Sequence, residues 1–408
     1  MGWWKSKTAS ANRESGSLGI DLNASRARAA TGRSTRNRIL LLDDPHPDLP
    51  LAISLEKRTA EIGRAGLALL RRLPHVTCTN FLPLTGQPHE WKHGRHHFDA
   101  IGAATLIFDK LQAQCGAYDG VYIALPSYLR VPQVTKLNAA AVKAGLKLKG
   151  TATAALAVAA DRIAALQNPK PAKDDAAKED WTTPLQRAGK AGLPFDIVIV
   201  DADEHALTGN LIRVEPNHVC LAATSVLPRL STRLWKDRLI DALSDRCVRV
   251  CRRDPRDSAE AEQTLFEQID DCLDRIRFGQ KIALTVRSAH WYQDLVLRPD
   301  EFEGYCSALI RETTNGITDL ITGSALPEPP RAVWLSHEAG RLPGLAKALH
   351  QSMAERTSVG VLRPEAVAVA IANLGERWQA GDLPNTHLDS AIPVAVRKPV
   401  RATNGVAG

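Results

Sequence analysis

Residues 195–214, with the sequence FDIVIVDADEHALTGNLIRV, constrain the fold more than any other part of the chain. Residues 197–200 are a short apolar run of β-branched side chains, which is typical of a strand covered on both faces. Asp201 ends this run, and residues 203–205 form a polar turn before a second apolar stretch. The pattern predicts a β-hairpin with a carboxylate at the end of a buried strand, a geometry that suits a phosphate and metal site.

A related pattern occurs earlier in the chain. Residues 18–30, LGIDLNASRARAA, again run from an apolar strand through Asp21 and a short polar turn into a second strand. Residues 33–43 are expected to add a third strand here, as residues 218–226 do in the later unit. Because Asp21 and Asp201 are 180 residues apart, the repeat is too long for a solenoid. It predicts two similar lobes that face each other across a cleft.

The segments between these units read as alternating strands and helices, which indicates crossover connections and parallel strand pairs. Gly145 is expected to cap the end of its helix, and Gly316 to end another helix early. The expected helices cover residues 56–73, 98–115, 131–144, 151–166, 232–247, 258–278, 301–321, 344–355 and 364–379, and further strands cover residues 120–125, 146–148, 282–286, 295–297 and 332–336.

These elements divide the chain into a tail, two lobes, a connection and a second tail. Residues 18–167 form lobe I, and residues 195–380 form lobe II with a C-terminal helix that returns to lobe I. Residues 168–194 contain several prolines and many charges, so they are expected to be a linker or surface excursion. Residues 1–17 and 381–408 are expected to be disordered or flexible.

The composition excludes several classes of protein. With 408 residues the chain is long enough for two cores, and it contains no apolar run of the ~18 residues that a membrane span needs. The net charge is +7, but the basic residues are scattered, so we expect no nucleic-acid partner. Seven irregularly spaced cysteines indicate reduced thiols and a cytoplasmic location.

The first residues, Met1–Gly2–Trp3–Trp4–Lys5–Ser6, fit the loose pattern for N-myristoylation. The two tryptophans beside a lysine also suit contact with a membrane surface. A frayed tail explains the same residues more simply, because short patterns occur often by chance.

A series of short motifs occurs in a fixed order along residues 18–380. They are LGID at 18–21, IGRA at 62–65, VYIALPSY at 121–128, NAAAVKAGL at 138–146, TAAL at 153–156, RPDEFE at 298–303, VWL at 333–335 and RLPGL at 341–345. In this order the motifs resemble the ATPase domain of the seventy-kilodalton heat-shock chaperones of the DnaK type. The resemblance implies an α/β, two-lobed actin-like ATPase (ribonuclease H-like) fold with a central cleft for ATP and Mg²⁺. It also implies that Asp21 and Asp201 hold hydrated Mg²⁺ and orient the attacking water.

The chain departs from this family where the nucleotide would bind. The family's second phosphate turn, Asp-Leu-Gly-Gly-Gly-Thr, corresponds to residues 201–206, DADEHA, so Asp203, Glu204 and His205 replace the glycines. Glycines let main-chain N–H groups approach a phosphate closely. Like charges at ~4 Å cost roughly 4 kcal/mol at a dielectric constant near 20. Micromolar affinity is worth only about 8 kcal/mol, so two carboxylates would remove most ATP binding.

Other family positions are also altered. The first phosphate turn corresponds to Asn23, Ala24 and Ser25, and the lysine that contacts the reacting phosphate corresponds to Leu67. The family's acidic residue corresponds to Thr151. The glycine pairs correspond to residues 231–232 and 337–338, and the adenine-contacting residues fall near Leu273, Asp274 and Arg277. The degenerate pocket is therefore expected to consist of Asn23, Ala24, Ser25, Asp203, Glu204, His205, His337, Glu338, Gly340 and Arg341.

Three functions follow as hypotheses. The first is a pseudo-ATPase scaffold that binds no cofactor, acts through an unidentified protein partner and has no peptide-binding domain after residue 380. The second is a weak ATPase or phosphotransferase that uses Asp21 and Asp201 with ATP and Mg²⁺. The third is a metal-binding protein that uses His205 and His337 with Asp203 and Glu204, although no metal is expected. For Asp21 and Asp201 a purely structural role, as carboxylates that cap hairpin turns, explains the sequence equally well.

Overall fold

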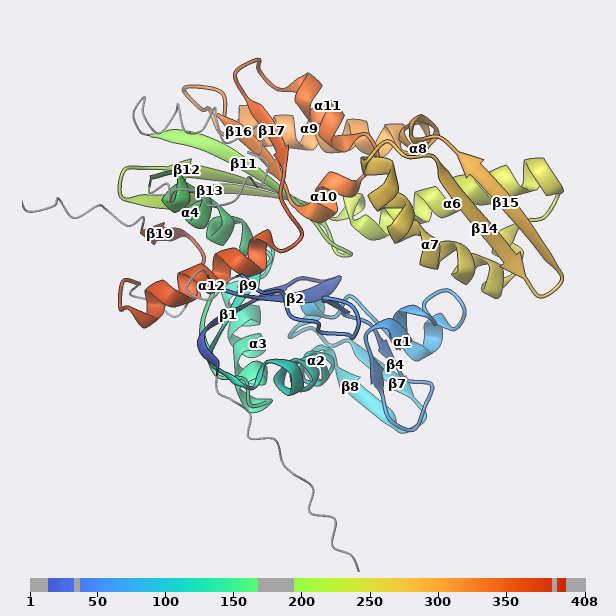
Figure 1. Cartoon of the computed structure of the whole chain (residues 1–408), viewed down its shortest axis with the longest axis horizontal. Helices are drawn as coiled ribbons and strands as arrows, with labels where there is room; N and C mark the ends of the chain where they lie inside the picture. Colours follow the sequence, from blue (N-terminus) through green and yellow to red (C-terminus); the bar gives the residue numbers. More distant parts are fainter. Residues whose placement is uncertain (1–13, 33–36, 168–193, 384–386, 394–408) are drawn as a thin grey trace, which may run out of the picture.

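Two six-stranded sheets organise the computed structural model, which describes residues 14–32, 37–167, 194–383 and 387–393 (Figure 1). The first sheet has the order β18-β10-β9-β1-β2-β3, with β1 Glu14–Leu22, β2 Arg26–Thr31, β3 Asp48–Pro50, β9 Tyr118–Leu125, β10 Leu148–Thr153 and β18 His387–Leu388. The second has the order β17-β16-β11-β12-β13-β19, with β11 Phe195–Ala202, β12 Leu207–Val214, β13 His218–Leu227, β16 Ala332–Leu335, β17 Ser358–Val361 and β19 Ala391–Pro393.

The two sheets share one pairing pattern. In the first sheet, β1 pairs antiparallel with β2 and parallel with β9. In the second, β11 pairs antiparallel with β12 and parallel with β16. Asp21 and Asp201 therefore lie near the same end of equivalent strands, before equivalent turns. The predicted pair of hairpins is confirmed, and the fold is mixed α/β.

Two helices, α4 (Ala154–Gln167) and α12 (Ala366–Gln379), lie between the sheets (Figure 1). One hydrophobic cluster joins side chains of both helices to Tyr122 of the first sheet and Ile199 and Trp334 of the second. The backbone of α12 comes so close to β1 that a Cβ on Gly19 would lie 2.1 Å from the carbonyl oxygen of Ala368. The glycine in the first hairpin unit thus allows the contact between helix and sheet.

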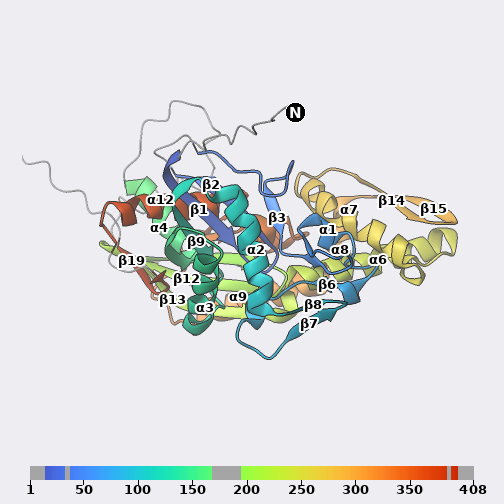
Figure 2. The ribbon, with the colours of Figure 1, turned by 90° about the horizontal axis from the view of Figure 1, so that it is seen from below.

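Other helices cover the outer faces of the sheets. Helices α2 (Ala100–Cys115) and α3 (Val131–Lys143) pack on each other beside the first sheet, and α9 (Ser307–Gly323) packs against β12 and β13 (Figure 2). Three shorter helices follow in the second half of the chain, α8 Pro299–Tyr305, α10 His337–Arg341 and α11 Leu345–Ser352. No helix in the described ranges is both long enough and apolar enough to cross a membrane.

We keep the names lobe I for residues 18–167 and lobe II for residues 195–380. Each of these two parts of the chain includes a smaller outer region at the side of the molecule opposite α4 and α12 (Figure 1). In lobe I it consists of β4 Ile53–Ser54, β5 Glu61–Ile62, α1 Arg64–Leu67, η1 Pro74–Val76, β6 Thr77–Cys78, η2 Leu82–Leu84, β7 Glu90–His93 and β8 His96–Asp99. In lobe II it consists of η3 Pro228–Leu230, α6 Thr232–Cys251, η4 Pro255–Asp257, α7 Ala259–Arg277, β14 Ile282–Ser288 and β15 Trp291–Leu297.

The long helix predicted over residues 56–73 is wrong, because only the four residues of α1 are helical there. Gly63 has φ +95°, which stops a helix from running through it, and the Gly66 backbone packs tightly against Ala52. Apolar residues of this segment pack on the hydrophobic core of the first sheet from an irregular stretch of chain, not from a helix. The third strand predicted at residues 33–43 is wrong for residues 37–43: β3 takes that place, and Ile39 makes an isolated bridge to Ala30. Residues 33–36 lie outside the described residues.

Further boundaries also differ from the prediction. Thr151 belongs to β10, and α4 begins only at Ala154, because β10 continues to pair with β9 through Thr153. The helix predicted over residues 301–321 is divided at Cys306 into α8 and α9, and Gly316 lies inside α9 rather than ending it. The strand predicted at residues 146–148 shares only Leu148 with β10, which continues to Thr153. The other predicted helices and strands are confirmed to within a few residues.

Residues 387–393 are not loose, contrary to the prediction for the tail. The β18 strand pairs with β10 of the first sheet, and β19 pairs with β13 of the second. The prediction of a tail over residues 1–17 fails for residues 14–17, which belong to β1. The predictions for residues 1–13, most of the 168–194 linker and residues 394–408 lie outside the described residues.

Candidate functional site

The two hairpin turns are closed by the same set of hydrogen bonds. In the first turn, Asn23 Oδ1 accepts from the main-chain N–H groups of Ser25 and Arg26 at 2.9 and 3.0 Å. In the second, Asp203 Oδ1 accepts from those of His205 and Ala206, also at 2.9 and 3.0 Å. Short polar side chains readily form such turns. Neither turn therefore needs glycine in order to reverse the chain.

The two turns are also bonded directly to each other. Asp203 Oδ2 accepts from the main-chain N–H of Ala24 at 3.0 Å and from the Tyr128 hydroxyl at 2.5 Å. The main-chain N–H of Glu204 donates to Ser25 Oγ at 2.8 Å. Asp203 is 2% exposed, so these bonds are shielded from water. The carboxylate of Asp203 therefore accepts hydrogen bonds from main-chain N–H groups of both turns, namely those of Ala24, His205 and Ala206.

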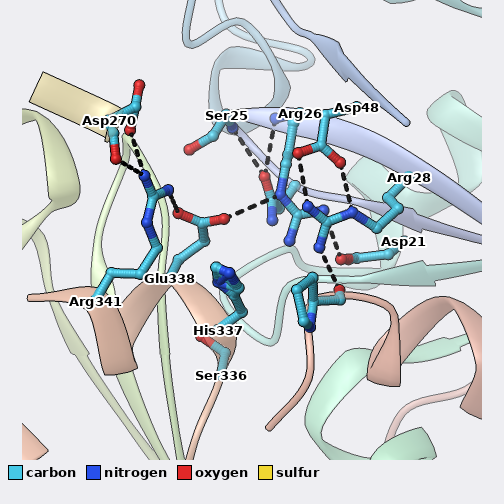
Figure 3. Close-up of polar contacts among 12 residues, drawn as sticks. Asp21, Ser25, Arg26, Arg28, Asp48, Asp270, Ser336, His337, Glu338 and Arg341 are labelled. Atoms are coloured by element: carbon cyan, nitrogen blue, oxygen red, sulfur yellow. Dashed lines mark hydrogen bonds and ion pairs between the residues drawn. The ribbon is translucent and has the colours of Figure 1, made fainter. Parts of the chain in front are cut away.

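A chain of buried ion pairs continues from the turns into lobe II (Figure 3). Arg26 donates to Asp21 at 3.0 Å and to Glu338 at 3.3 Å, so one guanidinium joins β2 of lobe I to α10 of lobe II. Glu338 in turn accepts from Arg341 at 2.9 Å. Glu338 and Arg341 share a face of α10 because they are three residues apart. Every carboxylate of this chain has a guanidinium beside it.

The network has two branches. On the lobe II side, Arg341 pairs with Asp274 at 2.8 Å and with Asp270 at 3.2 Å, and Lys236 pairs with Asp270 at 2.9 Å. On the lobe I side, Arg28 makes a two-pronged pair with Asp48 and also donates to the carbonyl oxygen of Pro364 (Figure 3). Such paired charges are costly to separate once buried.

The acidic groups at the base of the cleft have shifted pKa values. Burial, reinforced by the charges of Asp21 and Asp203, raises the pKa of Asp201 to about 7, although Ser336 opposes the shift. Burial also raises the pKa of Asp21, against the opposite effect of Arg26. Burial alone would raise the pKa of Glu338, but Arg341 and Arg26 hold it well below its usual range. Glu338 is therefore ionised at neutral pH, while Asp201 is only partly ionised.

The two predicted histidines lie in different surroundings. The ring of His205 packs against Tyr128 with centroids 4.7 Å apart. His337 lies 4.0 Å from Asp274, and burial lowers its pKa to about 4, so it is neutral. Within the described part of the chain, no three His, Cys, Asp or Glu side chains are grouped as a metal site requires.

Most of the predicted pocket residues do lie together. Asn23, Ala24, Ser25, Asp203 and Glu204 meet at the turns, and Glu338 and Arg341 meet Arg26 above them. Gly340 does not face the cleft: a Cβ there would lie 2.2 Å from Val361 Cγ1, so this glycine serves the packing of α10 on β17.

The sequence reasoning missed six residues of the network, namely Arg26, Arg28, Asp48, Tyr128, Lys236 and Asp270. For two of them a signal was present. Arg26 and Arg28 alternate with alanine in a strand whose residues are all buried. Side chains two residues apart in a strand point to one face, so two buried arginines there predict buried acidic partners. The partners come from distant segments and leave no local pattern.

The space that remains in the cleft is small. A cavity of about 230 Å³ lies among the network residues, below the roughly 300–1,000 Å³ of usual ligand sites. Its wall has one more acidic than basic side chain: Asp48, Glu204, Asp270, Asp274 and Glu338 against Arg26, Arg64, Lys236 and Arg341. This balance disfavours a polyanionic ligand.

The outer parts of the two lobes are joined as well. The main-chain N–H of Arg71 donates to Gln263 Oε1 at 2.8 Å, and Gln263 Nε2 donates to the carbonyl oxygen of Leu67 at 2.9 Å. The Arg71 guanidinium pairs with Asp237 and Glu262 and lies 5.0 Å from the ring centre of Phe266. We call this set of contacts the Arg71 clamp. The lobes are thus connected at the turns, along the ion pairs and at the clamp.

Comparison with known proteins adds no assignment to this geometry. No protein-family model matches the chain, and no curated protein is significantly similar to it.

Proposed function

We propose that this chain is a two-lobed, actin-like scaffold related to the ATPase domain of the seventy-kilodalton heat-shock chaperones, one that neither hydrolyses nor tightly binds ATP and acts through protein contacts. The ordered motifs and the two sheets with matching strand pairing support the relationship. The site supports the loss of nucleotide binding.

The observation that carries the proposal is the position of the Asp203 carboxylate. In the family that the sequence resembles, main-chain N–H groups of both turns contact the phosphates. Here Asp203 already accepts from the N–H groups of Ala24, His205 and Ala206. A phosphate would have to displace this carboxylate into water or share the site with its charge. Both outcomes are costly, because a buried charge and its donors would lose their partners.

The ion pairs between the lobes hold the two lobes together, as a bound ligand does in other two-lobed proteins. A nucleotide in such a cleft holds the lobes together by contacting both. Here Arg26 contacts both Asp21 of lobe I and Glu338 of lobe II, and the Arg71 clamp adds a second connection. The closed arrangement therefore needs no ligand, which suits a protein that offers a fixed surface to a partner.

Isothermal titration of the full chain with ATP and Mg²⁺ tests the proposal. We expect no binding at micromolar concentration. A thermal-denaturation scan with millimolar Mg-ATP should likewise leave the melting temperature unchanged, since a ligand stabilises only the state that it binds. Low-micromolar affinity would refute the proposal.

A variant sharpens this experiment. Asp203→Gly with Glu204→Gly returns two glycines to the second turn and removes both carboxylates. If the carboxylates are what excludes phosphate, this double variant should bind Mg-ATP more tightly than the parent chain. Asn23→Gly is the matched control, since it changes the equivalent turn without removing a charge. An equal gain in both variants would contradict the role assigned to Asp203.

A further inference from the structure

A second cavity lies between the lobes, bounded on one side by the Arg71 clamp. It measures about 350 Å³, within the range of small-molecule sites. Leu70, Arg71 and Trp91 of lobe I and Glu204, Arg233 and Phe266 of lobe II are among its walls. Glu204 and Lys236 belong to the walls of both this cavity and the smaller one in the cleft.

Glu204 is the first group that suggests a ligand. Its side chain is half-buried, and no residue in the described parts of the chain donates a hydrogen bond to its carboxylate or forms an ion pair with it. Lys236, the neighbouring cation, is already paired with Asp270 at 2.9 Å. A half-buried carboxylate without a partner is unusual, because the loss of hydration is not offset.

Arg233 is the second such group. Among the described residues its only ion pair is with Asp237 at 3.9 Å, and Asp237 also pairs with Arg71. The Arg233 side chain is 64% exposed, so its guanidinium is free to turn toward a ligand. Burial raises the pKa of Glu204, and the charges of Lys236 and, more weakly, Arg233 oppose this shift. Arg233 and Glu204 line the same cavity.

The same cavity also has apolar and aromatic walls. Phe266 is 6% exposed and is covered by the clamp, and Trp91 is half-buried and contributes to the lobe I wall. The cavity thus combines an unpartnered carboxylate, a weakly partnered guanidinium and an apolar wall. These are complementary to an ammonium group, a carboxylate and a carbon chain.

We propose that this cavity binds a free amino acid, with its ammonium group on Glu204 and its carboxylate on Arg233. Because the walls come from both lobes, the ligand would add to the contacts that hold the lobes together. The site adjoins the nucleotide position of the proposed function and shares Glu204 and Lys236 with the cavity there, but its other walls differ, and amino-acid binding does not depend on whether ATP binds.

Isothermal titration of the full chain with glycine, L-leucine, L-glutamate and L-lysine tests the proposal. We expect at least one of them to bind with submillimolar affinity. Isopentylamine and isocaproate, which carry only the ammonium or only the carboxylate on a similar carbon chain, should bind at least about tenfold more weakly than leucine. No heat with any amino acid at millimolar concentration would overturn the inference, and equal binding of the amine alone would overturn the assigned class.

Two variants locate the site. Glu204→Gln keeps the size of the side chain and should weaken amino-acid binding about tenfold or more, as should Arg233→Ala. Arg249→Ala is the matched control, because Arg249 is exposed on the same helix, α6, but does not line the cavity. Unchanged affinity in both site variants would refute the assignment. Titration of the parent with Mg-ATP separates this result from the proposed function.

Discussion

The two hairpin turns have almost the same backbone and opposite electrostatic roles. Asn23 and Asp203 hold equivalent positions and close their turns with equivalent hydrogen bonds. Asn23 carries a neutral amide and is followed three residues later by Arg26, whereas Asp203 carries a carboxylate and is followed three residues later by the apolar Ala206. Each lobe therefore supplies one charge that reaches into the other lobe: Arg26 to Glu338, and Asp203 to Ala24. Two hairpins with the same backbone can therefore close a cleft when one carries a positive charge, here Arg26, and the other a negative charge, here Asp203.

The largest expected effect is that of Arg26→Ala. The change leaves the buried Asp21 without its ion-pair partner and removes one of the two partners of Glu338, and removing one member of a buried pair costs about 3–5 kcal/mol. Urea denaturation of the variant and the parent measures the difference. Arg72→Ala, at an exposed arginine, should change the free energy of unfolding by less than about 0.5 kcal/mol. If both substitutions lowered the free energy of unfolding equally, the ion pairs of Arg26 would contribute no more to stability than an exposed arginine does.

The second prediction compares the two turns directly. Asp203→Ala removes the turn cap and the contacts with Ala24 and Tyr128, so we expect a loss of about 2–4 kcal/mol. Asn23→Ala removes only a cap within its own turn and should cost about 1 kcal/mol. Matched denaturation curves test the ranking. If Asn23→Ala proves as costly as Asp203→Ala, the bonds across the cleft are not what distinguishes the turns.

The third prediction concerns Asp201, whose pKa is raised from 3.8 to about 7 by burial and by Asp21 and Asp203. Between these two values the unfolded chain loses a proton that the folded chain retains, so the Asp201 contribution to stability falls as pH rises from about 4 to 7. Asp201→Asn removes this penalty. Because the residue is half-buried, we expect a gain of about 1–2 kcal/mol at pH 8 and none near pH 4.

Asp201→Asn also separates the proposed function from its alternative. If the chain is a weak ATPase that uses Asp21 and Asp201, phosphate release from ATP should fall in this variant. If the chain is a scaffold, the variant should be more stable at pH 8 and should differ in no other respect. Measuring both quantities on one preparation decides between them.

The smallest expected effect is at the Arg71 clamp. Its guanidinium is partly exposed, and its ion pairs are open to screening by salt. Arg71→Ala should cost about 1 kcal/mol, and the loss should shrink in 1 M salt. Hydrogen exchange in residues 64–73 and in α7 should become faster, since the clamp ties these segments together. A loss as large as that of Arg26→Ala would show that the outer contacts dominate closure.

Much of the framework was predictable from the sequence. The runs at residues 18–20 and 197–200, each ended by an aspartate, identified both hairpins because buried strands require continuous apolar residues. Helices such as α3 and α7 were found because their apolar residues repeat at helical spacing. The segment at residues 56–73 has similar spacing but is not helical, because the packing of Gly66 on Ala52 and the positive φ of Gly63 override it.

The site was predicted less completely, for a physical reason. Alignment of the turns identified Asp203, Glu204 and Glu338, and their charge suggested repulsion. The structure shows instead that Asp203 accepts hydrogen bonds from main-chain N–H groups and the Tyr128 hydroxyl. Glu338 pairs with Arg341 on its own helix and with Arg26 from a distant segment. Pairing across 312 residues follows from the fold and leaves no spacing that a single sequence could reveal.

The short strands β18 and β19 bear on how this protein is made. Both sheets take an outer strand from residues 387–393, so the first sheet, whose other strands are complete by Thr153, lacks a strand until a ribosome has passed residue 388. The edge of β10 that pairs with β18 therefore stays unpaired while all of lobe II is synthesised. Nascent chains arrested before that point should present this edge to chaperones or to one another, and release of residues 387–393 should end the exposure in both lobes together.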